Sequence, residues 1–103
     1  MGKLPSSWKA YNRTTRQFRD RYARLPPRIQ HLTRQACLLF HRDPEHPSLR
    51  HHPLEDRKAA SHTPGSFSVS ITMQYRAVYV REGDVNVWYW IGTHAEYDRF
   101  TGV

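Results

Sequence analysis

The sequence predicts an α+β fold, in which a helical hairpin packs on one face of an antiparallel sheet of three to four strands. Three observations predict it: apolar residues recur at helical spacing before Pro44, they alternate with polar residues from Phe67 onward, and no linker divides the chain. Because the helices come first and the strands follow, one helical layer against one sheet is the simplest arrangement. We expect residues 1–103 to form a single domain whose second sheet face is free for a ligand.

The first expected helix begins after a threonine. Thr14 or Thr15 can act as its N-cap, because a hydroxyl accepts a hydrogen bond from the free N–H groups of the first turn. Phe18, Tyr22 and Leu25 follow at i, i+4 and i+7, which places an apolar stripe on one side. Upstream, residues 8–12 could form a short edge strand, but their pattern is too short to decide.

A proline pair separates this helix from the next. Pro26 ends the first helix, and Pro27 can open the second, because proline is tolerated in the first helical turn. The second helix is expected to end at Asp43-Pro44. Its predicted buried stripe, at i, i+3, i+7 and i+10, consists of Ile29, Leu32, Ala36 and Leu39.

Three strands are expected in the C-terminal half. In residues 67–72, three apolar side chains alternate with Ser68, Ser70 and Thr72, which is typical of a half-buried strand. Residues 75–81 and 85–92 are rich in β-branched and aromatic side chains, and Glu82-Gly83-Asp84 between them indicates a turn. These segments predict an antiparallel meander.

The segment from Pro44 to Gly65 is expected to be an irregular surface stretch that contributes little to the core. It contains four of the seven histidines, but their spacing fits no common metal site, and no cysteine lies nearby. We therefore expect no metal and no other cofactor. His52 is a candidate for the rim of a pocket, and Arg57 and Lys58 add positive charge beside it.

The net charge of +7 is unevenly distributed. Residues 1–50 carry +8 and residues 51–103 carry −1, and 13 of the 16 cations are arginine. Arginine matches phosphate and carboxylate groups bidentately, so the helical half favours an anionic partner, either nucleic acid or an acidic peptide. For each arginine taken singly, a solvated helix face is the more economical explanation.

Nothing in the sequence indicates a membrane or an oxidising compartment. The longest mostly apolar run, residues 85–91, is too short to cross a bilayer, and the N-terminus lacks the apolar stretch of a signal peptide. The single cysteine, Cys37, excludes an intramolecular disulfide. We therefore expect a cytoplasmic protein with no membrane contact.

Three residues of the C-terminal half are candidates for a reactive site. Arg76 interrupts an apolar strand, and alternation places it on the face opposite Tyr75, Ala77 and Tyr79. It either pairs with an acid, extends its charged head outward into solvent, or faces a site that binds an anion. His94 and Tyr97 follow the end of the last strand at i and i+3, so they lie on one side of a turn or a short helix.

The order of these segments resembles the RelE/ParE superfamily of toxins from type II toxin–antitoxin systems. The most specific parts are residues 75–79, Tyr-Arg-Ala-Val-Tyr, and residues 92–97, Gly-Thr-His-Ala-Glu-Tyr. The resemblance covers nearly the whole chain and implies a helical hairpin against a curved antiparallel sheet. It also implies a toxin–antitoxin hetero-oligomer with an acidic antitoxin.

In ribosome-dependent members similar to RelE, the toxin cleaves mRNA in the decoding site and blocks translation. Carried over, the resemblance implies catalytic roles for Arg76, His94 and Tyr97, and a metal-independent endoribonuclease whose partners are the ribosome and mRNA. The His-Pro-Leu motif of some members of the superfamily corresponds to residues 52–54 of this chain. The positions expected to bind substrate are Arg50, His52, Arg57, Lys58 and Arg81.

One departure leaves alternatives open. RelE has two lysines on the strand that matches residues 67–71, where this chain has Ser68 and Ser70. Either other cations of this chain replace the two lysines, or the protein is a weak nuclease, or it is not a nuclease. The ParE branch inhibits DNA gyrase on the same fold. A catalytically degenerate toxin fold that binds an antitoxin or nucleic acid is the third alternative.

Overall fold

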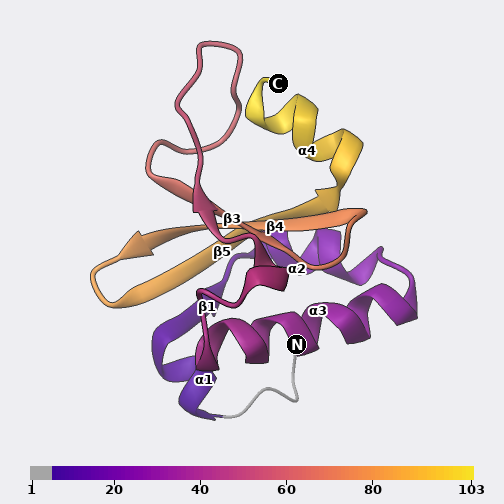
Figure 1. Cartoon of the computed structure of the whole chain (residues 1–103), viewed down its shortest axis with the longest axis vertical. Helices are drawn as coiled ribbons and strands as arrows, with labels where there is room; N and C mark the ends of the chain where they lie inside the picture. The colour runs from indigo at the N-terminus through magenta and orange to yellow at the C-terminus, as the bar shows by residue number, and fades with distance from the viewer. Residues whose placement is uncertain (1–5) are drawn as a thin grey trace.

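The computed structural model describes residues 6–103 and has three layers (Figure 1). The sheet lies in the middle, the N-terminal helices cover one face, and the C-terminal helix lies over the other. The elements, in chain order, are α1 Ser6–Tyr11, β1 Asn12–Thr14, α2 Arg16–Ala23, α3 Pro27–Arg42, the 3-10 turn η1 Pro47–Leu49, β2 His52–Pro53, β3 Ser66–Ser70, β4 Tyr75–Glu82, β5 Val85–Thr93 and α4 His94–Thr101.

The sheet confirms the α+β prediction but has five strands, in the order β1-β5-β4-β3-β2. The meander β3-β4-β5 is antiparallel as expected, whereas β1 pairs with β5 in parallel, so the sheet is mixed. The two extra strands are three and two residues long. Segments this short show no alternation, which is why the pattern did not reveal them.

The helical hairpin confirms the predicted caps and ends. Thr15 is the N-cap of α2, and its hydroxyl accepts a hydrogen bond from the Phe18 N–H at 3.1 Å. Pro27 is the first residue of α3. The buried face of α3 differs from the predicted stripe, because Leu32 and Leu39 are only half-buried. Its buried residues are Ile29, Thr33, Ala36, Cys37 and Phe40.

A β-bulge divides the aromatic residues of β5 between the two faces. Val78 pairs with Trp90 and the next residue, Tyr79, pairs with Trp88, so one residue of β5 is extra. Trp88 therefore packs in the core under the helices, whereas Trp90 packs on the opposite face with Val78 and Tyr97 of α4.

The second face of the sheet is not free, contrary to the prediction. Tyr97 of α4 is buried there, and Leu54 and Phe100 pack beside it. The segment before β3 also contributes more to the core than predicted, because Leu49 is 1% exposed. Among residues 6–103, no helix has the length and apolar content needed to cross a membrane.

Candidate functional site

The site begins at the junction of β5 and α4. Thr93 caps the helix: its hydroxyl accepts from the Glu96 N–H at 3.2 Å, and the Glu96 carboxylate accepts from the Thr93 N–H at 2.8 Å. This capping box starts α4 directly after the strand. His94 and Tyr97 therefore lie in its first turn, where the i, i+3 spacing brings them together as predicted.

Arg76 of β4 reaches this turn across the sheet. Its Cα is paired with that of Gly92, the residue before the cap. The guanidinium lies 5.0 Å from the centre of the Tyr97 ring, and Nε lies 3.5 Å from His94 Nδ1. The rings of His94 and Tyr97 are 6.1 Å apart. The structure thus brings the three predicted catalytic residues together, with Arg76 on the predicted face.

Asp98 belongs to the same group, although the sequence pattern did not single it out. Its carboxylate lies 3.6 Å from His94 Nε2, at i+4 on α4. Because a guanidinium only donates, His94 Nδ1 faces Arg76 as an acceptor, and Nε2 carries the proton toward Asp98. The i, i+4 spacing on a recognised helix was the signal that would have found this partner.

A pocket of about 250 Å³, here called the His52 pocket, lies beside Tyr97. His52 and Arg57 line it together with Leu54, Tyr97 and residues of the C-terminus. His52 Nδ1 lies 2.7 Å from the carbonyl oxygen of Arg50. A carbonyl only accepts, so Nδ1 carries the proton and Nε2 of the neutral ring keeps its lone pair. Exposed His52 therefore offers a proton acceptor at this pocket.

The other predicted substrate-binding residues are spread over the molecule. Arg57 pairs with Glu55 at 3.0 Å, and Lys58 is exposed on the same loop. Arg50 lines a different pocket, of about 450 Å³, beside the β3–β4 turn, and has the positive φ of 44°. Arg81 lines a pocket with Tyr79 and the helices, on the face opposite Arg76. Only His52 and Arg57 share a pocket with a predicted catalytic residue, Tyr97.

The serines of β3 are buried rather than solvated. Ser66, Ser68 and Ser70 are 0%, 0% and 6% exposed. The hydroxyl face of this strand therefore lies inside the protein, and the strand is buried on both sides instead of half-buried. No cation stands at positions 68 and 70 beside the candidate site.

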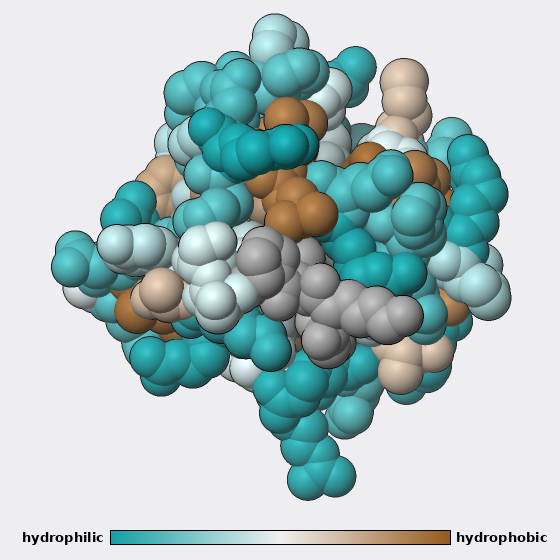
Figure 2. All heavy atoms as spheres, turned by 90° about the horizontal axis from the view of Figure 1, so that it is seen from below, coloured by the Kyte–Doolittle hydropathy of each residue, from teal (hydrophilic) through white to brown (hydrophobic). Residues whose placement is uncertain are grey.

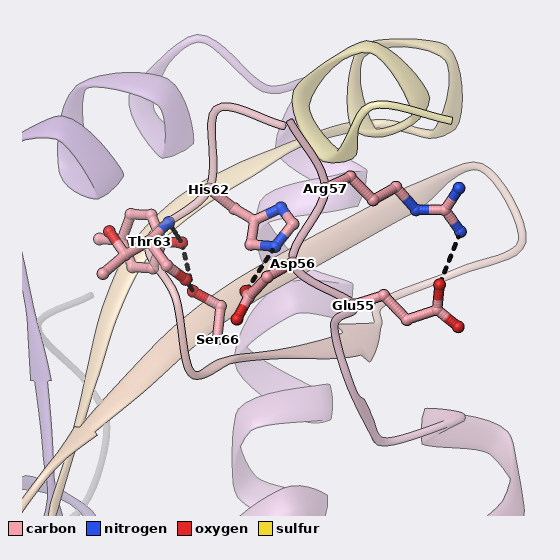
Figure 3. A network of polar contacts seen from close by, with 7 residues as sticks. Glu55, Asp56, Arg57, His62, Thr63 and Ser66 are labelled. Carbon is pink, nitrogen blue, oxygen red and sulfur yellow. Dashed lines mark hydrogen bonds and ion pairs between the residues drawn. The ribbon is translucent and has the colours of Figure 1, made fainter. Parts of the chain in front are cut away.

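The loop between β2 and β3 is tied to the sheet near Ser66 (Figure 3). The Tyr89 hydroxyl accepts from the Thr63 N–H at 3.0 Å and lies 2.5 Å from Ser66 Oγ. His62 is buried, and its Nε2 lies 3.6 Å from Asp56 within the loop. Figure 3 shows Arg57 and Glu55 on the other arm of the same loop.

The pKa values of Cys37 and Glu96 are shifted by their surroundings. Burial raises the pKa of Cys37 to about 12, so this thiol stays protonated and unreactive. The Thr93 N–H, above all, lowers the pKa of Glu96, which keeps that carboxylate ionised at the start of α4. Within residues 6–103, no three His, Cys, Asp or Glu side chains gather as a metal site.

No protein-family model matches this chain, and no curated protein sequence matches it. Several solved structures, however, match the fold of this chain. YafQ from E. coli strain BL21(DE3) superposes with a TM-score of 0.66 at 14% identity, over 84% of this chain and 94% of YafQ. The YoeB/ParE toxin from Agrobacterium tumefaciens gives 0.62 at 20% identity, over 82% of this chain and 98% of that one.

A third similar structure is the toxin–antitoxin complex RelBE2 from Mycobacterium tuberculosis, with a TM-score of 0.62 at 24% identity, over 82% of this chain and 96% of that one. Identities this low establish the fold alone. The helical hairpin, the sheet with its C-terminal helix and the three superpositions agree: this protein has the RelE/ParE-like fold of toxins from toxin–antitoxin systems.

Proposed function

We propose that this protein is the toxin of a toxin–antitoxin system and acts as an endoribonuclease that cleaves mRNA on the ribosome without a metal ion. The observation that carries the proposal is the meeting of Arg76, His94 and Tyr97 next to a pocket lined by His52. These groups supply what cleavage of an RNA phosphodiester requires.

Cleavage begins when the 2′-hydroxyl oxygen attacks the adjacent phosphorus and loses its proton. The bond from phosphorus to the 5′ oxygen then breaks, and that oxygen takes up a proton, which leaves a 2′,3′-cyclic phosphate and a 5′-hydroxyl. The reaction therefore needs a proton acceptor, a proton donor and positive charge next to the phosphorane-like transition state.

The side chains divide these tasks by chemistry. His52 accepts the 2′-hydroxyl proton at Nε2, whose lone pair is available because Nδ1 donates to the Arg50 carbonyl. His94, once protonated, donates a proton to the leaving oxygen. Arg76 forms no ion pair within residues 6–103, so its charge remains available to the phosphate. Tyr97 is buried, and its ring lies under the Arg76 guanidinium and holds it in place.

The proposed partners are the ribosome, its mRNA and an acidic antitoxin that forms a hetero-oligomer with this protein. Among the similar solved structures are the DinJ–YafQ complex, at a TM-score of 0.64, and the RelBE2 complex, and both are toxin–antitoxin complexes. The charge of +8 on residues 1–50 supports an acidic partner. Arg50, Arg57 and Lys58 are proposed to contact the RNA backbone.

The test is mRNA cleavage in a translating extract to which the purified protein is added. We expect discrete cleavage products, and we expect His94→Ala and His52→Ala each to slow cleavage by about a hundredfold, the usual contribution of a general acid or base. His31→Ala is the matched control, because His31 is exposed on α3, away from the site. Intact mRNA during continued translation would refute the nuclease.

A second candidate is a gyrase inhibitor of the ParE type. It is favoured by the residues at positions 68 and 70, which are buried serines where RelE has two lysines. Gyrase-dependent DNA breakage without mRNA cleavage would select this candidate. Normal folding with neither activity would select a degenerate toxin fold that binds an antitoxin or nucleic acid.

A further inference from the structure

A second polar pocket lies on the face of the sheet opposite Arg76. It has a volume of about 250 Å³ and lies between α1, the C-terminal end of α3 and the β4–β5 hairpin. We call it the Tyr11 pocket after one of its lining residues. Its exposed lining residues are Tyr11, Pro44, Glu45 and Arg81. Buried Tyr79 and Phe40 contribute to its floor.

A chain of polar contacts holds Glu45 in this pocket. His51 Nδ1 lies 3.4 Å from Glu45 Oε1, and His51 Nε2 lies 2.7 Å from the Tyr79 hydroxyl. The nearby carboxylate favours the proton on Nδ1 of His51, so the Tyr79 hydroxyl donates to Nε2. Burial raises the pKa of Tyr79 to about 12, which keeps this hydroxyl protonated. The Glu45 side chain is still 83% exposed, so it has oxygen lone pairs left for a ligand.

Arg81 provides the opposite charge. It is exposed on β4, its Cα is paired with that of Asn86, and it forms no ion pair with any residue from 6 to 103. The charges of Arg81 and Glu45 act on the pKa of the same Tyr79 hydroxyl in opposite directions. A guanidinium and a carboxylate therefore face one small pocket without pairing with each other.

An aromatic wall completes the pocket. Tyr11 is 54% exposed, which is unusual for a large hydrophobic side chain in this protein. Its ring stacks on that of His41, with centroids 6.3 Å apart and planes inclined by 28°. A stacked ring pair with one open face is a platform for a planar ligand.

We propose that the Tyr11 pocket binds a guanine base. Arg81 donates to guanine O6 and N7, the most frequent specific contact of arginine with a base. Glu45 accepts from the N1–H and the N2 amino group, and the base stacks on Tyr11. Adenine has an amino group in place of O6, no proton on N1 and no N2 amino group, so Glu45 would lose both donors and Arg81 would keep only N7. Because the pocket lies across the sheet from His94, the inference does not depend on the proposed cleavage.

The test is a titration followed by two-dimensional ¹H–¹⁵N NMR, with guanosine, inosine and adenosine 5′-monophosphates as probes. We expect guanosine monophosphate to bind at least about tenfold more tightly than adenosine monophosphate, with inosine monophosphate between them because it lacks the N2 amino group. The shifted signals should include those of Tyr11 and Asn86.

Two variants and two matched controls locate the binding. Glu45→Gln and Arg81→Gln should each weaken guanosine monophosphate binding by about tenfold. Glu82→Gln and Arg42→Gln remove the same charges from exposed neighbours outside the pocket and should leave binding unchanged. All four positions are exposed, so the fold is retained, and circular dichroism checks it.

A second pair of probes distinguishes a free nucleotide from a base within RNA. The 2′-O-methyl pentanucleotides UUGUU and UUAUU resist cleavage at the 2′ position. Tighter binding of UUGUU than of guanosine monophosphate identifies a base within a strand, and the reverse identifies a free nucleotide. Equal binding of guanine and adenine probes, no saturable binding, or shifts confined to residues around the His52 pocket would overturn the proposal.

Discussion

At the scale of single residues, the surroundings of Arg76 determine the role of this cation in the candidate site. The sequence left three roles for a cation in an apolar strand: a structural ion pair, a head group that extends into solvent, or an anion site. Within residues 6–103 no carboxylate pairs with it, and its neighbours are the Tyr97 ring and His94. Its Nη1 atom is buried without a hydrogen-bond partner in the same residues. A ligand that supplies oxygen atoms would satisfy this group.

Gly92 is a position where an added methyl group should be costly. A Cβ there would lie 2.7 Å from the Trp90 ring, 2.8 Å from the Arg21 guanidinium and 2.8 Å from Glu96 Oε1. We expect Gly92→Ala to lower the free energy of unfolding by about 1–3 kcal/mol, as overpacking usually does. Urea denaturation measures the difference.

Gly83→Asn is the control for this substitution. Gly83 lies in the β4–β5 turn with φ +59°, and a Cβ there meets no atom within 4 Å. Asparagine tolerates that conformation, so the stability should change little. Equal stability of Gly92→Ala and the wild type would contradict the close approach at the start of α4.

Glu96 should make stability depend on pH. Its folded-state pKa is lowered from 4.5, first by the Thr93 N–H, so its stabilising effect is complete above about pH 4.5 and is lost as the pH falls through the folded-state pKa. We expect Glu96→Gln to be less stable than the wild type at pH 7 and to approach it at pH 3. Urea denaturation at both pH values measures the two differences.

The control is Glu82→Gln, at an exposed carboxylate in no capping box. The difference in stability between Glu82→Gln and the wild type should be the same at pH 7 and pH 3. A stability difference for Glu96→Gln that is the same at pH 7 and pH 3 would mean that the capping box does not act through the ionised carboxylate.

At the scale of elements, α4 and the β2–β3 loop form one unit over the sheet. The Ser61 N–H donates to the Phe100 carbonyl at 2.8 Å, so the loop is bonded to the helix that carries His94. The loop is bonded to β5 as well, through Tyr89. The unit brings Arg57 to the His52 pocket from one side and Tyr97 from the other.

Tyr89→Phe should loosen this loop selectively. It removes the hydroxyl that accepts from the Thr63 N–H and contacts Ser66 Oγ, and it keeps the ring packed near Phe100. We expect amide hydrogen exchange in residues 54–65 to rise severalfold, and global stability to fall by about 1–2 kcal/mol.

Tyr75→Phe is the matched control, since Tyr75 is half-exposed and lies on the other face of the sheet. It should leave exchange in the loop unchanged. Unchanged exchange in Tyr89→Phe would show that packing, rather than these hydrogen bonds, holds the loop.

At the scale of the whole molecule, charge and candidate chemistry are separated by the sheet. The helical layer presents a mostly hydrophilic surface around a small hydrophobic area (Figure 2). Some of its arginines are structural: Arg21 pairs with Glu96 at 3.5 Å, and Arg34 donates to the Tyr22 hydroxyl at 2.6 Å. Others are exposed, namely Arg13, Arg16, Arg19, Arg24, Arg28 and Arg42.

These exposed arginines predict salt-dependent binding to RNA. For a 20-nucleotide single-stranded RNA, log K should fall linearly with the logarithm of salt concentration. Arg16→Gln with Arg24→Gln should reduce the slope by about 0.7 for each phosphate that these side chains no longer neutralise. Fluorescence anisotropy over a salt series measures the slope.

The matched control removes one positive charge from the other side of the sheet: Arg99→Gln on α4, compared with Arg16→Gln alone. A smaller change in the slope is expected for Arg99→Gln, because Arg99 does not lie on the surface of the helical layer. Equal affinity for RNA at low and high salt would contradict electrostatic binding by these arginines.

Much of the fold was predictable because it follows local rules. The prolines at positions 26 and 27, the Thr15 cap and the alternation in residues 67–71 each restrict the backbone within a few residues. The short strands β1 and β2 were not predictable, because pairing with a distant strand creates them. The same holds for the bulge in β5, which separates Trp88 from Trp90.

The candidate site, like the fold, was predictable only in those features that depend on neighbours in the chain. The sequence alone established its reactive residue types and the spacing of His94 and Tyr97, since both depend on neighbours in the chain. Only the tertiary structure decided that Arg76 meets them, that His52 shares a pocket with Tyr97, that Arg81 lies across the sheet and that the β3 serines are buried. The physical reason is that contacts between distant segments depend on strand register and on which element covers each face, and neither is encoded in any short stretch of chain.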